Sequence, residues 1–134
     1  MITISINLQT DLTIAWDCWT NPLHIINWNF ASADWCCPKA TNNLVIGGKF
    51  SYTMADKNSE MRFDFSGIYT KIEYLKIINY TTDDNRLVEI NFSEKDNLVT
   101  IILKFEHENV HPKDFQKNGW QAILDNFKKY VETI

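Results

Sequence analysis

The chain ends with HPKDFQKNGWQAILDNFKKYVETI (residues 111–134), and this stretch decides the fold. Pro112 suits the first turn of a helix. A helix of roughly 20 residues would be about 30 Å long, at 1.5 Å per residue. Gly119 weakens such a helix by about 1 kcal/mol relative to Ala, and we expect it to mark close approach to a neighbouring strand. The apolar residues recur at helical spacing, which predicts a wide apolar stripe made by Trp120, Ile123, Leu124, Phe127, Val131 and Ile134.

Residues 44–107 supply the apolar surface that so long a helix needs, because they read as consecutive β-strands. Apolar and polar residues alternate there, as in Phe50, Tyr52 and Met54, and the turn signals DKNS, TDDN and EKDN separate the strands. Consecutive strands joined by short turns predict an antiparallel meander. The apolar parity changes around Gly67, which predicts a bulge or kink in the longest strand.

The N-terminal part adds one strand and two short helices. Residues 2–8 alternate in the strand pattern, and Asn21 followed by Pro22 is a strong signal for the start of the second helix. The next stretch, NFASADWCCPKATNN (residues 29–43), has no sustained period, and Pro38 argues against a central strand. We therefore predict a long irregular connection over residues 29–43.

The expected order is one strand, two short helices, about six antiparallel strands and a long helix. This order predicts an α+β fold in which a curved antiparallel sheet of about six or seven strands wraps around the C-terminal helix. We expect residues 1–134 to form a single domain, since 134 residues can bury a real core. A cavity is expected between sheet and helix, because a curved sheet cannot press on a straight rod everywhere.

Composition excludes several classes of protein. The net charge is −4 and no basic patch is visible, which argues against a nucleic-acid partner. The first ten residues alternate without a basic start or an apolar run, so we expect neither a signal peptide nor membrane insertion, and a cytoplasmic location. The three cysteines are too few, and odd in number, for a disulfide framework.

Cys36 and Cys37 are adjacent and invite a metal or redox interpretation. Neighbouring side chains point in different directions and rarely share one tetrahedral ion, and no second C-x-x-C is present. We favour a structural role, in which one of the two packs inward as a small apolar side chain beside Trp35 while Pro38 fixes the backbone.

Other ionisable residues give no convincing catalytic set. A cysteine nucleophile would need a histidine and an orienting third group, and no local motif supports this for His24, His107 or His111. Asp64, Glu89 and Lys104 lie on predicted strands, where a solvated face is expected. One of them pointing inward would become a candidate general acid or base. No catalytic residue, metal or cofactor is predicted.

Four blocks of the sequence resemble a known family: WTNPLHIINWNF (19–30), GGKFSYTM (47–54), DFSGIYTKIE (64–73) and GWQAILDNFKKYVE (119–132). Their order and spacing are similar, over almost the whole chain, to the activator of heat-shock-90 ATPase homologue-like family. That family belongs to the START-like (SRPBCC), birch-pollen-allergen-like helix-grip superfamily. The resemblance implies the helix-grip fold with an internal, mostly apolar pocket.

The resemblance also implies a range of functions. Named relatives bind lipids, sterols, polyketides or plant hormones, a few are cyclases, and the eukaryotic namesake stimulates a chaperone ATPase. The family often has an Arg in a strand before the double glycine, as in DLRVGG, whereas this chain reads NLVIGG with Val45 at that position. No role of that Arg can be carried over.

The leading functional hypothesis is a START-like protein that binds a small hydrophobic, lipid- or polyketide-like ligand between sheet and helix, with residues 29–43 as a lid. An enzyme of cyclase or hydrolase type on the same scaffold is the alternative. A chaperone-interacting domain, with its cavity filled by side chains, is a third reading, and a homodimer is left open. The expected pocket residues are aromatic: Trp28, Trp35, Phe50, Tyr52, Phe63, Phe65, Tyr69, Trp120 and Phe127.

Overall fold

A computed structural model describes residues 1–134 and contains seven strands and three helices. The elements follow the chain in this order: β1 (Ile2–Gln9), α1 (Leu12–Thr20), α2 (Pro22–Ile25), β2 (Trp35–Asn42), β3 (Lys49–Asp56), β4 (Arg62–Glu73), β5 (Ile77–Thr82), β6 (Leu87–Lys95), β7 (Leu98–Phe105) and α3 (Lys113–Val131). None of the helices combines the length and the apolar character that crossing a membrane would require.

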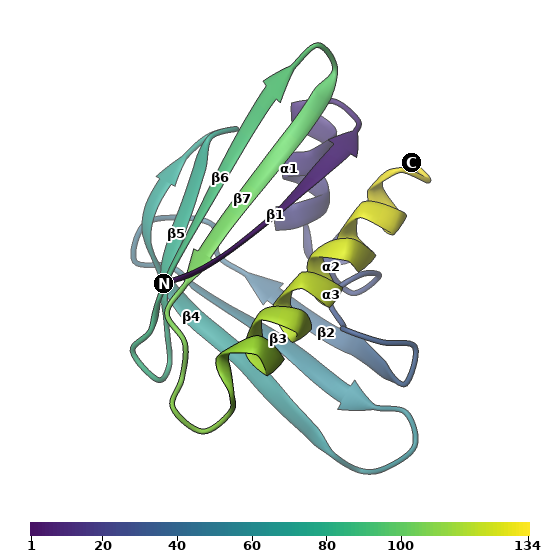
Figure 1. The fold of residues 1–134 in the computed structure, drawn as a ribbon, viewed down its shortest axis with the longest axis vertical. Helices are drawn as coiled ribbons and strands as arrows, with labels where there is room; N and C mark the ends of the chain where they lie inside the picture. Colours follow the sequence, from purple (N-terminus) through teal and green to yellow (C-terminus); the bar gives the residue numbers. More distant parts are fainter.

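All seven strands pair in one antiparallel sheet, in the order β1-β7-β6-β5-β4-β3-β2. The sheet curls, and α3 lies across its concave side, while α1 and α2 join the first strand to the last strand of the order (Figure 1). The predicted α+β helix-grip fold is confirmed. Each strand from β3 to β7 pairs with the next along the chain, which confirms the predicted meander.

The two short helices begin where capping residues satisfy free backbone N–H groups. The Asp11 carboxylate accepts a hydrogen bond from the Ile14 amide at 2.8 Å, and the Asn21 side chain accepts one from the Leu23 amide at 3.0 Å. Pro22 occupies the first turn of α2, where its missing N–H costs nothing. These caps set the tight corner that closes one end of the sheet.

The predicted irregular connection over residues 29–43 is wrong for its second half. Trp35–Asn42 form β2, an edge strand paired only with β3. One extra residue is inserted between Cys36 and Lys39, so the inward positions shift parity along the strand. This bulge removed the period-2 signal from the sequence, and Pro38 is tolerated because an edge strand can spare a backbone donor.

The NLVIGG segment is also not a strand. Residues 44–48 form the turn between β2 and β3, and Val45 and Ile46 are exposed. Gly47 has a φ of +83°, and a Cβ on Gly48 would collide with the carbonyl oxygen of Asn43. The double glycine is therefore explained by a tight turn.

The bulge in the longest strand lies at Thr70, between Tyr69 and Lys71, and not at Gly67 as predicted. Gly67 instead faces inward, where a Cβ would meet the Phe50 ring at 2.8 Å and the Thr81 carbonyl oxygen at 2.8 Å. The glycine lets the fully buried Phe50 ring pack directly on the β4 backbone.

Gly119 in α3 behaves in the opposite way, since a Cβ there would meet nothing within 4 Å. The expected close approach to a strand is wrong. We predict that Gly119→Ala raises the free energy of unfolding by about 1 kcal/mol, from helix propensity alone. Gly67→Ala should lower it by about 1–3 kcal/mol through overpacking against Phe50. Urea unfolding measures both, and a stabilised Gly67→Ala variant would contradict the packing described for Phe50.

Candidate functional site

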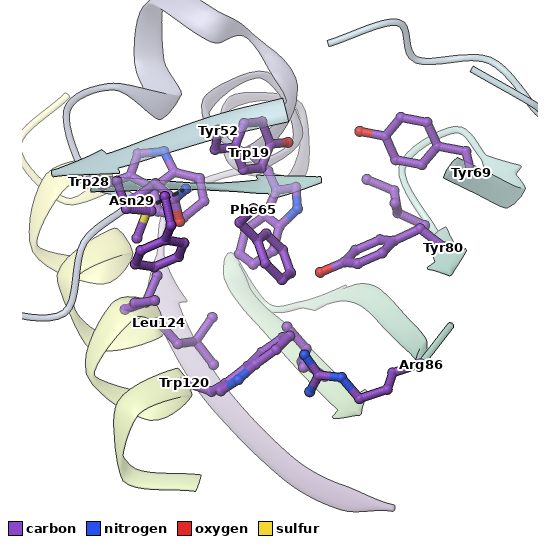
Figure 2. Close-up of a pocket in the computed structure, with 15 residues that line it drawn as sticks. Trp19, Trp28, Asn29, Tyr52, Phe65, Tyr69, Tyr80, Arg86, Trp120 and Leu124 are labelled. Atoms are coloured by element: carbon purple, nitrogen blue, oxygen red, sulfur yellow. Dashed lines mark hydrogen bonds between the residues drawn. The ribbon is translucent and has the colours of Figure 1, made fainter. Parts of the chain in front are cut away.

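A cavity of about 240 Å³ lies between α3 and the concave face of the sheet. Figure 2 shows side chains from the sheet, from α3 and from the α1–α2 region converging around it. Hydrophobic residues make up 13 of the 15 that line it. The lining residues are Trp19, Trp28, Asn29, Tyr52, Met54, Phe63, Phe65, Tyr69, Ile78, Tyr80, Arg86, Leu103, Trp120, Ile123 and Leu124.

The cavity is off-centre because α3 lies along one edge of the sheet. Gln121 Nε2 donates to the Ser5 carbonyl oxygen at 3.2 Å, and Lys128 Nζ donates to the Asn7 carbonyl oxygen at 2.8 Å. The Gln9 amide donates to the Glu132 carboxylate at 2.9 Å. These contacts hold one flank of the helix against β1, so the opposite flank faces β3, β4 and β5 across a gap.

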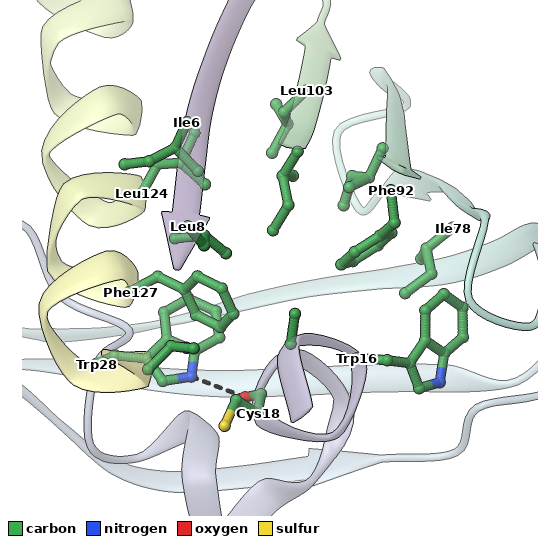
Figure 3. Close-up of a cluster of buried hydrophobic side chains, with 14 of the residues drawn as sticks. Ile6, Leu8, Trp16, Cys18, Trp28, Ile78, Phe92, Leu103, Leu124 and Phe127 are labelled. Atoms are coloured by element: carbon green, nitrogen blue, oxygen red, sulfur yellow. Dashed lines mark hydrogen bonds between the residues drawn. The ribbon is translucent and has the colours of Figure 1, made fainter. Parts of the chain in front are cut away.

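The space nearest β1 is filled. In Figure 3, Ile6 and Leu8 of β1 lie beside Leu124 and Phe127 of α3, and all four belong to the main hydrophobic core. Phe127 is fully buried there. The open volume therefore lies on the other flank of α3, between Trp120, Ile123 and Leu124 and the strands beyond β1.

Six of the nine aromatic residues expected at a pocket line the cavity: Trp28, Tyr52, Phe63, Phe65, Tyr69 and Trp120. Phe50 and Phe127 do not line it; they are 1% and 0% exposed and belong to the core around it. Trp35 also lies outside the lining, with its ring 5.9 Å from that of Phe63 in an edge-on arrangement. Whether the lining residues bind a ligand stays a prediction.

Two tryptophans form the end of the cavity beside α1 and α2. The Trp19 and Trp28 ring centroids are 5.1 Å apart, and the Trp28 indole donates to the Cys18 carbonyl oxygen at 2.9 Å. Asn126 of α3 donates to the Trp28 carbonyl oxygen at 2.8 Å. The Trp28 ring is thus fixed in place, and its indole N–H is not free for a ligand.

Three tyrosines place phenol groups on the sheet side of the cavity. The Tyr69 hydroxyl donates to the Asn42 side-chain oxygen at 2.5 Å. The Tyr80 hydroxyl has no protein hydrogen-bond partner and points into the cavity in Figure 2. Burial raises the pKa of Tyr69 to about 12, and it raises the pKa of Tyr52 and of Tyr80 well above the ordinary value. All three phenols therefore stay protonated near neutral pH.

Arg86 lines the opposite end of the cavity and carries the one formal charge in the lining. Its Nε donates to the Asp84 carboxylate at 2.7 Å, and its Nη1 donates to the Glu106 carbonyl oxygen at 3.3 Å. Partial burial would raise the pKa of Asp84, but hydrogen bonds from Thr82 and Arg86 outweigh it and lower that pKa. The ion pair therefore stays charged and orients the guanidinium.

Arg86 belongs to the alternation of β6, a signal that is present in the sequence. The inward residues of β6 are Val88, Ile90 and Phe92, and Arg86 has the same parity. Extending the alternation back by one step places this side chain on the concave face. Tyr80 could have been found in the same way, since it alternates with the buried Ile78. The other lining residues that were not predicted are Trp19, Asn29, Met54, Ile78, Leu103, Ile123 and Leu124.

The remaining candidates lie outside the lining. Cys37 is 2% exposed, which confirms that one cysteine of the pair packs inward; Cys36 is half-buried, and all three cysteines are free. No three His, Cys, Asp or Glu side chains gather closely enough to hold a metal ion. The His24 ring contacts the Tyr130 hydroxyl of α3 at 2.6 Å and the Asp17 carboxylate of α1 at 3.2 Å. The His107 ring contacts the Glu108 carbonyl oxygen, and the His111 ring contacts the Glu108 carboxylate, both at 3.1 Å.

The strand charges face away from the cavity. Asp64 is exposed and accepts a hydrogen bond from Thr53 at 2.7 Å. Glu89 and Lys104 lie directly opposite each other on β6 and β7, on the outer face of the sheet. The expected solvated face is confirmed for these three residues.

Comparison with known proteins gives one family and a set of solved structures. The family model described as "Activator of Hsp90 ATPase homolog 1-like protein" matches residues 10–132. A solution structure of an AHSA1-like protein from Aeromonas hydrophila is 36% identical, has a TM-score of 0.87, and aligns over 98% of this chain and 93% of that one. A protein from Cytophaga hutchinsonii is 39% identical, with a TM-score of 0.85 over 98% and 92% of the two chains.

More distant structures share the fold alone. A protein from Nitrosomonas europaea is 14% identical, yet its TM-score is 0.83 over 98% of this chain and 94% of that chain. No curated protein matches the chain.

The buried phenols predict loss of stability at alkaline pH. Tyrosines in the unfolded chain ionise near pH 10, roughly, whereas Tyr69 in the folded chain ionises at about 12. The stabilisation from its neutral form is fully present below the unfolded pKa and is lost as the pH rises through the folded pKa. We expect phenolate absorbance of the buried tyrosines to appear together with loss of the far-UV circular dichroism signal. If all five tyrosines ionise reversibly at about pH 10 while the fold stays intact, the burial of Tyr52, Tyr69 and Tyr80 is contradicted.

Proposed function

The chain belongs to the Activator of Hsp90 ATPase homolog 1-like family, and we propose that it binds a small hydrophobic ligand, lipid- or polyketide-like in chemistry, in the cavity between the sheet and α3. The observation that carries the proposal is an open, mostly apolar cavity built by aromatic side chains from several elements. Ligand pockets typically combine such a lining with a few polar groups that orient the ligand.

The size of the cavity limits the ligand. Its volume of about 240 Å³ exceeds the roughly 150 Å³ of an apolar cavity known to hold benzene, and it lies just below the range of about 300–1,000 Å³ typical for drug-sized ligands. A molecule with one or two rings, or a short acyl chain, suits this volume. A whole sterol or a long-chain lipid is too large without movement of the lining.

The chemistry of the lining favours binding over catalysis. No Asp, Glu, His, Cys or Lys side chain lines the cavity. The ionisable groups present are Arg86 and three tyrosines whose raised pKa values keep them protonated. A hydrolase or cyclase of the acid–base type would need a group that can accept a proton near neutral pH, and the cavity offers none.

The open cavity also bears on the chaperone-interaction hypothesis. That reading expects side chains to fill the space between sheet and helix, since the outer face of the sheet would carry the function. The unfilled volume beside Tyr80 and Trp120 supports ligand binding instead. The name of the family describes what a homologue does to a chaperone and supplies no observation on this chain.

The proposal predicts a bound small molecule that a cavity-filling substitution displaces. Native mass spectrometry of freshly purified protein should show an added mass, because an apolar cavity of this size retains hydrophobic ligands. Ile123→Trp places a large ring in the cavity and should weaken retention by about tenfold or more.

Ile68→Trp is the matched control, since Ile68 is exposed on the outer face of β4 and should leave the added mass unchanged. Thermal unfolding checks that both variants fold. Absence of any bound species, together with no rise in Tm across a panel of small hydrophobic compounds, would contradict ligand binding.

A further inference from the structure

We propose that the cavity selects a small apolar acid, a one- or two-ring molecule with a single anionic group whose oxygens bind the Arg86 guanidinium. This inference rests on the proposed function, because it names the class of ligand that the same cavity holds. Arg86 is the sole charged side chain among the 15 lining residues, and its side chain is only 20% exposed. A positive charge at one end of a mostly apolar cavity favours an apolar ligand that carries a negative group at one end.

The guanidinium is held in a fixed orientation by the turn between β5 and β6. The Thr82 hydroxyl donates to Asp84 and accepts from the Arg86 amide at 3.0 Å, and Asp84 accepts from Arg86 Nε at 2.7 Å. The Glu106 carbonyl oxygen accepts from Nη1. The Arg86 side chain is therefore already ordered, so it loses little conformational entropy when a ligand binds.

The terminal edge of the guanidinium retains donor capacity. A guanidinium has five N–H groups, and the protein acceptors described above engage only Nε and Nη1, so Nη2 has no protein acceptor. Asp84 lies on the Nε side, and its own side chain is 56% exposed, which leaves the cavity side of the cation without a carboxylate. Carboxylates are the partners that match this donor edge best.

The neighbouring polar group is also a donor. The Tyr80 hydroxyl points into the cavity without a protein partner, and Tyr80 lines the same cavity as Arg86. Neither the Arg86 Nη2 nor the Tyr80 hydroxyl donates to a protein acceptor. An alcohol offers these donors one neutral oxygen, whereas a carboxylate offers two oxygens and a negative charge, which strengthens its hydrogen bonds to a guanidinium.

The remaining walls favour a flat ring. Trp120 is held by face-to-face stacking on Phe105, with centroids 4.2 Å apart and planes inclined by 7°, and Phe65 meets it edge-on at 5.8 Å. Trp19 and Trp28 bound the far end. Rigid aromatic walls accept a planar molecule with offset or edge-on contacts.

Naphthoate and naphthylmethanol test the inference, because they share a two-ring body and differ in the charge of one substituent. Isothermal titration calorimetry should give naphthoate an affinity at least about tenfold higher for the wild-type chain, as expected for hydrogen bonds to a charged partner. Arg86→Gln should abolish this preference by lowering the affinity for naphthoate about tenfold, with a much smaller change for naphthylmethanol. The chain has one other arginine, the exposed Arg62, and Arg62→Gln should retain the preference.

A second variant keeps the test valid if Arg86→Gln does not fold. Asp84→Asn keeps one of the two acceptor oxygens that Asp84 offers and removes the competing negative charge, so it should tighten naphthoate binding several-fold relative to naphthylmethanol. Equal affinity of the two probes for the wild-type chain would overturn the selection of an acid and leave the proposed binding function standing. Failure of both probes to bind the wild-type chain would overturn the binding function together with this inference.

Discussion

The cavity depends on the attachment of one flank of α3 to the edge strand β1. Ser5, Asn7 and Gln9 present backbone groups on the free edge of the sheet, and polar side chains of α3 and of its C-cap residue Glu132 pair with them. Each such bond contributes only about 1 kcal/mol. All three hydrogen bonds nevertheless pull α3 toward β1 and fix its lateral position over the sheet. Burial of the apolar stripe of α3 fixes the distance between the helix and the sheet. An edge that would otherwise expose unpaired groups is covered, and a gap remains between the opposite flank of α3 and the strands it faces.

Aromatic side chains make the resulting gap stable as an open space. Phe50 packs on Gly67 and touches the rings of Tyr52, Phe65 and Tyr80, so the sheet side of the cavity is a connected layer of rings. Such a layer has few rotamers available for collapse into the gap. The polar side chains of the lining are the three tyrosines, Asn29 and Arg86, and the β5–β6 turn holds Arg86 in place. The same fold therefore supplies an apolar volume and one oriented cation.

Much of this fold could be predicted from the sequence, because the strongest signals were periodic. Alternation of apolar and polar residues predicted the meander, and the apolar stripe around Phe127 predicted α3. The packing of α3 on the sheet follows from these two apolar surfaces. β2 was missed because the bulge beside Pro38 interrupts its period. Which aromatic residues line the cavity could not be predicted in full, since the sequence pattern does not distinguish rings buried by packing, such as Phe50 and Phe127, from rings at the gap, such as Phe65. Arg86 was detectable by its parity, but its fixed orientation depends on contacts between distant segments.

The most direct test of the account is the set of indole N–H signals in a nitrogen–proton correlation spectrum during titration with naphthoate. Trp19, Trp28 and Trp120 line the cavity, whereas Trp16 packs on Tyr74 and Phe92 away from it. We predict that the signals of the three lining tryptophans shift together in a saturable way while that of Trp16 stays in place. A saturable shift of Trp16 alone, or unchanged signals for all three lining tryptophans, would contradict a ligand site between α3 and the sheet.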